Sequence, residues 1–270
     1  MSCLDPWLGM PSIEVLPELT ELTPVQRVRG HDMWLKRDDL FRIAGVNGGK
    51  ARSCWQLAKG AAGLTTGSSR VSTQCIIVSS VAKELGIPCH VHTALGELTK
   101  ELLRCQSLGA EVFQHYNGFS QNLASWAAKD AVTMDWTSIP FGMESNCAIH
   151  CTKQQVDNLP SVGRIVLSIG SGITAAGILW GLLERGWNIP VLGVRVGGGT
   201  KGSNLERRLC RYAPRDYNKM MEIVKATVPY DKHIDAEIGG VKVDPHYEAK
   251  VVEFLRPGDL FWIVGDRGAL

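Results

Sequence analysis

The stretch Asn47-Gly48-Gly49-Lys50-Ala51-Arg52 places one lysine directly behind two glycines, at the start of a segment with helical spacing. Because glycine has no side chain, the backbone here can approach a flat ligand closely. A lysine amine in such a place becomes a nucleophile once it is neutral, a state that partial burial and a neighbouring cation favour. Taken alone, the stretch is equally typical of a surface lysine after a turn.

Alternating strand and helix patterns surround this stretch on both sides. Apolar residues recur at helical spacing in some segments, and short buried-type runs lie between them. This alternation predicts α/β structure with parallel sheets. The expected helices are 50–60, 74–86, 98–108, 119–130, 174–185 and 245–255, and the expected strands are 33–37, 87–92, 110–113, 164–168, 191–196 and 260–264.

A second glycine loop, Gly170-Ser171-Gly172-Ile173-Thr174, lies between the strand at 164–168 and the helix that follows. Backbone N–H groups at such a helix N-terminus bind anions, and the Ser171 and Thr174 hydroxyls add donors. Ile173 carries a side chain, so its φ must be negative. A dinucleotide loop would need an acid about twenty positions later, and this chain has Val191 and Gly193 there. A purely structural turn remains the plainer alternative.

The third segment is Asp244-Pro245-His246-Tyr247-Glu248-Ala249-Lys250. On its own it is typical of a helix that begins after Asp-Pro, with Glu248 in the first turn where the helix dipole favours an acid. That explanation accounts for Glu248 but not for the residues around it.

In this order, the three segments resemble the pyridoxal-phosphate (PLP) enzymes of fold type II, the tryptophan-synthase-β superfamily. The branch most similar is that of 1-aminocyclopropane-1-carboxylate deaminase and D-cysteine desulfhydrase. The resemblance runs from about residue 23 to 264 and includes an Ile139-Pro140-Phe141-Gly142 turn. It implies two three-layer α/β/α lobes: a large lobe of 1–64 plus 139–270, and a small mobile lobe of 65–138 whose closure would exclude water.

The resemblance also implies a role for each segment. Lys50 would hold PLP as a Schiff base and later move a proton, and Arg52 matches the family's Lys-x-Arg. The loop Gly170, Ser171, Gly172, Ile173 and Thr174 would hold the phosphate. Glu248 would keep the pyridine nitrogen protonated, which strengthens the electron sink. Tyr247 would act as acid, base or nucleophile, although its hydroxyl needs local help to ionise at neutral pH.

A fourth segment, Ser69-Arg70-Val71-Ser72-Thr73-Gln74, falls where the family has a turn that opens a helix. By that match Ser72 is a catalytic and substrate-binding residue, and Gln74 binds substrate. Thr73 stands where the family has an asparagine on the cofactor ring. Arg70 is foreign to the pattern and suits an anionic group. An N-cap cluster explains Ser72 and Thr73 equally well.

Several departures from the family bear on the reaction. Asn47 precedes the glycines, whereas the family's asparagine follows them; we still expect it to bind the cofactor. The segment 199–243 is shorter than in typical family members and lacks a clean match to their second active-site tyrosine, for which Tyr230 is the nearest candidate. The ending Gly265-Asp266-Arg267 also differs. Ring opening of a cyclopropane substrate is therefore not a firm expectation, and the extra arginines favour a larger or anionic substrate.

These observations lead to three functional hypotheses. The first is a PLP-dependent lyase or deaminase that forms a carbanion at the amine-bearing carbon of an amino acid. The second is isomerisation or decarboxylation of an amino acid attached to a nucleic-acid base, as in phage DNA hypermodification, and rests on the basic stretch 201–219. A solvated helix face explains that stretch equally well. The third is a non-catalytic binding protein with a PLP fold.

Composition limits the remaining options. The formal net charge is +2, too small to indicate a polyanion partner, and 44% hydrophobic residues suffice for a substantial core. None of the eight cysteines forms a CxxC pair, and Cys147, His150 and Cys151 lack further ligands nearby, so we expect no metal. Without a leader or membrane segment, a cytoplasmic protein is expected. Many family members are dimers, so by analogy a homodimer is one expected assembly.

Overall fold

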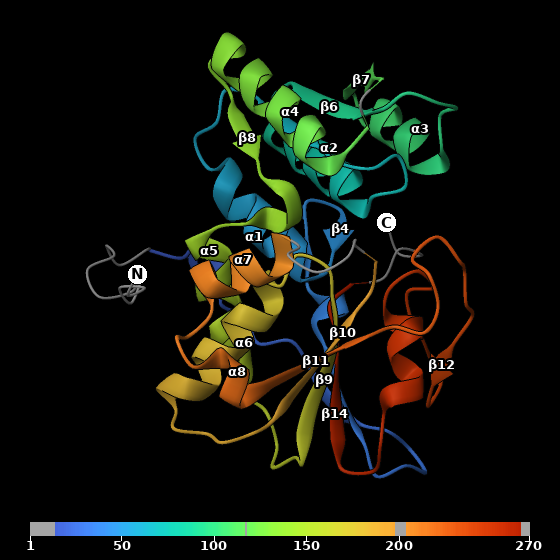
Figure 1. Ribbon diagram of the computed structural model, residues 1–270. Coiled ribbons are helices and arrows are strands. Elements are labelled where there is room, and N and C mark those ends of the chain that lie inside the picture. The colour runs from blue at the N-terminus through green and yellow to red at the C-terminus, as the bar shows by residue number, and fades with distance from the viewer. Residues whose placement is uncertain (1–13, 117, 198–203, 266–270) are drawn as a thin grey trace. The chain divides into compact units, whose positions relative to one another are not determined.

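Two separate sheets, each built mainly of parallel strands, divide the chain into two units (Figure 1). The computed structural model describes residues 14–116, 118–197 and 204–265. Within these, the first unit contains the residues up to 41 and 146–265, and the second contains 42–145. The expected α/β class with parallel sheets is confirmed.

The first unit has a six-stranded sheet in the order β1-β2-β14-β9-β10-β11. Only β1 runs antiparallel to its neighbour; the other pairs are parallel. The strands are β1 Val25–Arg27, β2 Trp34–Arg37, β9 Arg164–Ile169, β10 Val191–Arg195, β11 Met221–Lys225 and β14 Asp259–Ile263. The helices are α5 Asn146–Lys153, α6 Ile173–Glu184, α7 Asn204–Tyr212 and α8 Tyr217–Met220, and the hairpin β12 Glu237–Ile238 and β13 Val241–Lys242 stands apart.

The strand order of this sheet reverses between β9 and β14. From β9 the chain passes through α6 to β10 and then outward to β11, whereas β14 pairs with the opposite side of β9. The connections on either side of this point therefore leave in opposite directions. Ligands of open α/β sheets bind outside the carboxyl ends of the strands at such a switch point.

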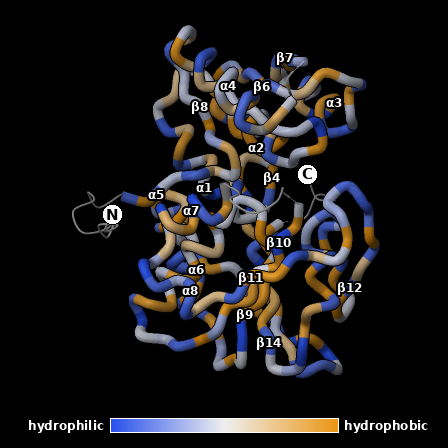
Figure 2. The backbone as a smooth tube through the Cα atoms, in the orientation of Figure 1, coloured by the Kyte–Doolittle hydropathy of each residue, from blue (hydrophilic) through white to orange (hydrophobic). Residues whose placement is uncertain are grey.

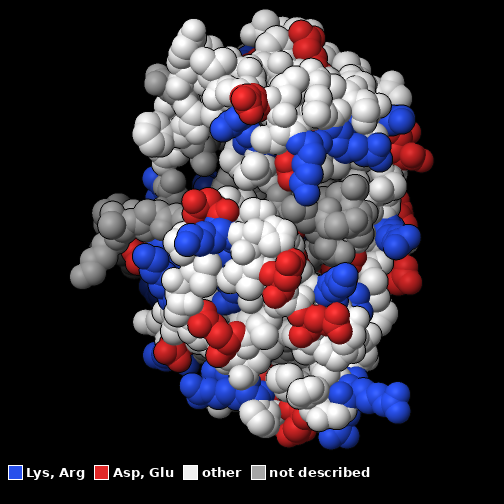
Figure 3. All heavy atoms as spheres, turned by 90° about the vertical axis from the view of Figure 1, so that its right-hand side faces the viewer, with Lys and Arg blue, Asp and Glu red and all other residues white. Residues whose placement is uncertain are grey.

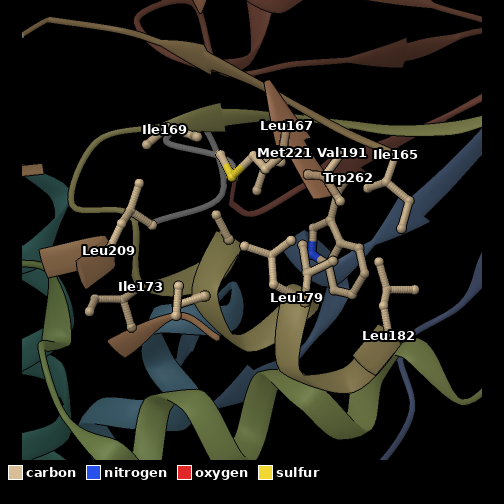
Figure 4. Close-up of a cluster of buried hydrophobic side chains, with 14 of the residues drawn as sticks. Ile165, Leu167, Ile169, Ile173, Leu179, Leu182, Val191, Leu209, Met221 and Trp262 are labelled. Atoms are coloured by element: carbon tan, nitrogen blue, oxygen red, sulfur yellow. The ribbon is translucent and has the colours of Figure 1, made fainter. Parts of the chain in front are cut away.

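Alternating side chains of β9 fill both faces of this sheet. Ile165, Leu167 and Ile169 lie in a cluster with α5, α6 and α7, while Val166 packs in a second cluster on the opposite face. Figure 4 shows the first cluster, with Leu179 of α6 pointing toward the strands. Figure 2 shows the same hydrophobic concentration along the central strands. A strand buried on both faces explains the continuous apolar run that predicted it.

The second unit has a four-stranded parallel sheet in the order β7-β6-β5-β8, with α4 packed on β5, β6 and β8 and α2 packed on β5 and β6. Its strand order reverses between β5 and the edge strand β8, because the chain runs outward from β5 to β6 and β7 and then returns to the other side of β5. The elements are β3 Arg42–Ile43, β4 Val46–Asn47, α1 Gly49–Ala58, β5 Leu64–Gly67, α2 Thr73–Leu85, β6 Cys89–Ala94, α3 Lys100–Ser107, β7 Glu111–His115, α4 Ser120–Met134 and β8 Thr137–Ile139.

The two units divide the chain at different points from the lobes that the family resemblance implies. Residues 42–64 and 139–145, expected in the large lobe, belong to the second unit. The reason is local packing, because α1 packs against α2 and β8 of that unit. Mobility of the smaller lobe stays a prediction.

The prediction of a long helix over 245–255 is wrong. Residues Glu248–Phe254 form a 3₁₀ helix, labelled η5, and the segment before it is a turn. The Asp244 carboxylate accepts hydrogen bonds from the backbone N–H groups of His246 (2.8 Å) and Tyr247 (3.0 Å). These bonds satisfy the backbone outside a helix, as Asx turns do. The short strands β5, β8 and β11 were missed, because three to five residues give too little periodicity to detect.

Six cysteines, at 54, 75, 89, 105, 147 and 151, are buried in the core, as expected of small apolar residues. Burial raises the pKa of the Cys89 thiol to about 12 and that of Cys105 to about 11. Such thiols stay protonated and unreactive. Within the described part of the chain, no helix has the length and apolar character needed to cross a membrane.

A histidine network joins α4 to the sheet of the second unit. Asp130 Oδ2 lies 2.7 Å from His90 Nδ1 and 3.0 Å from His92 Nε2, and His92 Nδ1 lies 2.9 Å from His115 Nε2. Burial alone would raise the pKa of Asp130, but the hydrogen bonds from His92 and His90 outweigh it, and the pKa lies below its usual value.

We expect Asp130→Asn to lower the free energy of unfolding by about 1–2 kcal/mol at neutral pH, because charged hydrogen bonds are lost. Since the pKa of Asp130 is depressed on folding, its contribution is present above the unfolded pKa and lost as pH falls through the folded one. The difference between variant and wild type should therefore shrink in acid. Urea unfolding of both proteins, from neutral to acidic pH, measures this difference.

Asp135→Asn, at the end of the same helix, is the control, because it removes an acid that contacts none of these histidines. An Asp130→Asn penalty that stayed constant down to strong acid would show that the network does not hold the carboxylate charged.

Candidate functional site

Gly172 shapes the glycine loop that follows β9. Its φ is +87°, a conformation that L side chains rarely adopt, and an added Cβ would lie 2.7 Å from Leu205 Cδ1. Both backbone conformation and packing therefore require glycine at this position. The helix α6 begins at the next residue, so Ile173 has helical φ as predicted. The loop thus turns directly from a central strand into a helix N-terminus.

The N-terminus of α6 is an anion-binding feature. Its first backbone N–H groups have no partner inside the helix and carry the positive end of the helix dipole. Ser171 and Thr174 are half-buried beside them. The next strand, β10, carries no acid and ends in Arg195, so the ribose-binding acid of a dinucleotide fold is missing there. Phosphate binding at this loop fits the chemistry better.

Glu248 lies at the switch point of the first sheet, with 3% of its surface exposed. Its Oε1 accepts hydrogen bonds from Ser168 Oγ of β9 (3.2 Å) and from the Val264 backbone N–H after β14 (3.3 Å). Burial, followed by the nearby Asp244 carboxylate, raises the pKa of Glu248 to about 8. The hydrogen bonds lower it only in part. A buried carboxyl that keeps its proton near neutral pH is typical of a functional site.

Tyr247 lies over the glycine loop. An added Cβ on Gly170 would sit 3.4 Å from Tyr247 Cε1 and 3.6 Å from its hydroxyl oxygen, so the absence of a side chain lets the ring approach. The Tyr230 ring meets Tyr247 edge-on at 5.2 Å. The loop, Tyr247 and Glu248 are therefore gathered at one edge of the first sheet, as their order in the sequence predicted.

In the second unit, a tight hairpin positions the lysine. Strands β3 and β4 pair antiparallel and are joined by Ala44 and Gly45, both with positive φ, as in a type I′ turn. Asn47 ends β4 with 7% of its surface exposed, and Gly48 (φ +96°) is the N-cap of α1. Lys50 is thus the second residue of α1.

The turn before α2 has the N-cap geometry that we considered as an alternative. Ser72 is the N-cap, and its hydroxyl accepts a hydrogen bond from the Gln74 backbone N–H at 3.2 Å. Thr73 is the first residue of the helix, half-buried. Capping and substrate binding are compatible, because the other N–H groups of this helix terminus still point outward.

Gln74 has a different task from the one expected. Its side-chain amide donates to Thr66 Oγ1 (2.9 Å) and to the Pro140 carbonyl (3.1 Å), and its oxygen accepts from the Gly142 N–H (2.7 Å). Both of its donors are therefore engaged inside the unit. It joins the ends of β5 and β8, the switch point of the second sheet, and explains the Ile-Pro-x-Gly turn. We describe it as a positioning residue.

Arg70 contacts the loop at 96–99 of the second unit. Its Nη1 donates to the Glu97 carbonyl at 3.1 Å, and an added Cβ on Gly96 would lie 2.4 Å from the same nitrogen. Thr99 Oγ1 donates to the Arg70 carbonyl. The guanidinium is thereby fixed in place, with further N–H donors that can bind an anion.

The family model described as "Pyridoxal-phosphate dependent enzyme" matches residues 15–241. The chain belongs to this family. Its cofactor is therefore PLP, and the predicted family and cofactor are confirmed.

Curated relatives agree with this assignment. The "Serine dehydratase-like" protein of Mus musculus is 27% identical over 194 residues, covering 67% of this chain and 56% of that protein. The Homo sapiens protein of the same description is 26% identical over 197 residues, covering 68% and 57%. The match therefore spans little more than half the length of these relatives.

Solved structures confirm the fold. A structure described as an "ACC deaminase homologue" aligns with a TM-score of 0.75 at 22% identity, covering 96% of this chain and 93% of that one. Threonine deaminase isoform 2 from Solanum lycopersicum aligns with a TM-score of 0.63 at 13% identity, covering 90% and 78%. At these identities the likeness shows fold type II alone.

The residues of the first unit suit PLP chemically. An anion-binding loop and a buried carboxyl at the same switch point match a ligand with a phosphate and a ring nitrogen that binds a proton. Because Gly170 has no side chain, the Tyr247 ring lies close to the loop, beside the place where a phosphate would bind. Glu248 is the group that would meet the nitrogen, because it is the buried acid bonded to Ser168 of the central strand.

The basic stretch 201–219 has an ordinary explanation where it is described. Helix α7 buries Leu205 and Leu209 and exposes Arg207 and Arg211 on its other face, as amphipathic helices do. Residues 201–203 lie outside the described part, as do 266 and 267 of the C-terminal ending. On the face drawn in Figure 3, acidic and basic side chains are interspersed. Nothing in this distribution favours a nucleic-acid partner.

The Cys147, His150 and Cys151 group lies on the single helix α5. The Sγ atoms of Cys147 and Cys151 are 3.7 Å apart and buried. Among the residues that the structure describes, no set of three His, Cys, Asp or Glu side chains is arranged to hold a metal ion.

We expect Glu248→Gln to stabilise the cofactor-free protein increasingly as pH rises. The pKa of about 8 exceeds the usual value of 4.5, so the carboxyl stabilises the fold only while protonated. This stability is full below the unfolded pKa and is lost as pH rises through the folded one. Glutamine carries no such penalty. The variant should gain on the order of 4 kcal/mol relative to wild type between about pH 4 and pH 8, because each pH unit between the two pKa values contributes about 1.4 kcal/mol.

Chemical unfolding of the two proteins across this pH range measures the gain. Glu222→Gln is the matched control, since Glu222 is an exposed acid on β11 of the same unit. A wild-type-minus-variant difference that does not change with pH would contradict a raised pKa at Glu248.

Proposed function

We propose that this chain uses PLP to remove a proton at the amine-bearing carbon of an amino acid and to eliminate a group from the adjacent carbon, as a deaminase or dehydratase-type lyase. The observation that carries the proposal is the buried Glu248 carboxyl at the switch point of the first sheet, bonded to Ser168 and to the Val264 N–H. PLP supplies the electron sink that makes a carbanion accessible.

Glu248 would hold the proton on the ring nitrogen. Its pKa of about 8 in the cofactor-free protein means that the site favours one proton there at neutral pH. If the ring nitrogen takes up this proton, the neutral buried acid becomes one half of an ion pair. The Ser168 hydroxyl and the Val264 N–H would stabilise the carboxylate through their hydrogen bonds to it. A carboxyl partner therefore favours carbanion chemistry more than an uncharged partner does.

Lys50 would be the covalent anchor and the base. Its amine is presented by the first turn of α1 behind Gly48 and Gly49. When free, the Lys50 amine would be placed to take the proton from the substrate carbon. Tyr247 would donate or accept the second proton, because its hydroxyl lies beside the glycine loop. Asn47 and Thr73 complete the proposed cofactor contacts.

The N-terminus of α2 would bind the substrate carboxylate through its N–H groups and the Ser72 hydroxyl. Arg70, whose guanidinium lies against Gly96, would add a positive charge for an anionic substrate. Serine and threonine are the first substrates to test, because curated relatives and solved neighbours carry those names. 1-Aminocyclopropane-1-carboxylate and D-cysteine follow, from the ACC deaminase likeness.

We expect wild-type protein loaded with PLP to show a visible absorption band that borohydride removes, leaving the label on the peptide that contains Lys50. Lys50→Ala should lose the band while it folds normally. Lys59→Ala, at the end of the same helix, should keep it. Absorption spectra and peptide mass mapping decide. A label on another lysine would refute the assignment of Lys50.

The substrate class follows from release of ammonia and a keto acid by the loaded enzyme. We expect turnover of at least one small amino acid and none of an amino acid joined to a nucleoside. The reverse result, together with DNA binding that weakens steeply with salt, would favour the nucleic-acid hypothesis. Bound PLP with no turnover of any amino acid, and full biological function of Lys50→Ala, would favour a non-catalytic binding protein.

A further inference from the structure

Lys250 carries a buried ammonium group in the first unit. The residue is 1% exposed, and its Nζ donates to the Pro229 carbonyl at 2.6 Å and to the Tyr230 carbonyl at 2.7 Å. Nζ also lies 5.5 Å from the centre of the Tyr230 ring. A charge is buried only where hydrogen bonds compensate for the lost water, and two short bonds to carbonyl oxygens do so here.

The bonds of Lys250 belong to a wider connection between two segments, 229–234 and 245–250. The Tyr230 carbonyl accepts a second bond from His246 Nδ1 at 3.2 Å, and the Ile234 N–H donates to the Pro245 carbonyl at 3.2 Å. Three side-chain and backbone groups from 245–250 thus fix the turn at Tyr230. Residues 229–234 belong to no strand or helix, so these contacts with 245–250 help to set the position of the turn.

The fixed turn directs the Tyr230 ring onto Tyr247. The centroids of the two rings are 5.2 Å apart, and the ring planes make an angle of 66°. Tyr230 also packs against Gly197, where an added Cβ would lie 3.2 Å from Tyr230 Cβ. Tyr247 contacts the loop at Gly170 in turn. Tyr247 therefore lies between Tyr230 and the glycine loop, and Tyr230 restricts the directions in which it can move.

We propose that Lys250 is a positioning residue, which holds Tyr230 against Tyr247 and so fixes the Tyr247 hydroxyl over the glycine loop. The inference rests on the proposed function in one respect, the role of Tyr247 in proton transfer. The clamp, by which we mean the contacts of Lys250 that hold Tyr230 against Tyr247, rests on the described contacts alone. A lysine fits the task because its ammonium donates to two carbonyls from a narrow stem, whereas an apolar side chain of the same length would leave both carbonyls without these donors.

The same unit provides a matched control. Lys36 is 0% exposed, and its Nζ donates to the Thr23 carbonyl (2.9 Å) and to Asn158 Oδ1 (2.7 Å). It is a buried, hydrogen-bonded lysine like Lys250, yet its bonds go to residues with no part in the site. Lys36→Met therefore reports the general effect of removing a buried ammonium.

The experiment compares Lys250→Met with Lys36→Met in two states. In cofactor-free protein, ring-labelled tyrosine NMR follows the five tyrosines of the chain, assigned through Tyr230→Phe and Tyr247→Phe. In PLP-loaded protein, absorption titration gives cofactor affinity, and steady-state kinetics give kcat and KM. We expect Lys250→Met to remove the mutual ring-current shifts of Tyr230 and Tyr247. We expect kcat to fall roughly tenfold or more, as misplaced catalytic groups do, with cofactor affinity within about threefold.

Lys36→Met should leave the ring shifts and kcat unchanged. Unaltered Tyr247 shifts in Lys250→Met would overturn the proposal, and so would altered shifts with normal kcat. If Lys250→Met does not fold, Tyr230→Leu keeps the lysine and removes the ring; it should reproduce the Tyr247 shift and the loss of kcat, and a normal result would overturn the proposal. Wild-type protein that binds no PLP would instead overturn the proposed function, while the NMR comparison still tests the clamp.

Discussion

The pairing of β9 with β14 on one side and β10 on the other is the constraint on which the first unit depends. It places the strand order reversal at β9, and ligands of open α/β sheets bind at the carboxyl ends of the strands beside such a reversal. The glycine loop must then begin there, because β9 ends at Ile169. Glu248 reaches the same place through bonds to Ser168 of β9 and Val264 after β14. One strand pairing thus brings together an anion loop and an acid.

The second unit uses the same principle with different chemistry. Its sheet reverses between β5 and β8, and the uncharged amide of Gln74 bonds to both strand ends. An amide that donates twice and accepts once fixes the Pro140–Gly142 turn without a buried charge. A carboxyl at the equivalent point of the first sheet keeps an adjustable proton instead. The two switch points therefore differ in chemistry: Gln74 has a structural role, whereas Glu248 is a candidate functional acid.

The sequence predicted those parts of the fold and site that depend on local rules. Ile173 must not adopt positive φ, and a strand buried on both faces must be largely apolar; each follows from neighbouring residues. The 3₁₀ helix at 248–254 did not follow, because the pattern suits an α-helix start equally well, and the bonds that Asp244 accepts from His246 and Tyr247 are compatible with either. Likewise the task of Gln74 depends on residues 66 positions away.

By itself, the sequence determined the α/β class, the order of the lysine, the glycine loop and the acid, and the family to which the chain belongs. These features are encoded in spacing, glycine positions and hydropathy, which act within a few residues. Tertiary structure alone decided that Glu248 meets Ser168, 80 residues before it, and that Lys250 clamps the turn at Tyr230. The physical reason is that a buried proton or charge is governed by its solvation and its partners, and folding supplies both from distant parts of the chain.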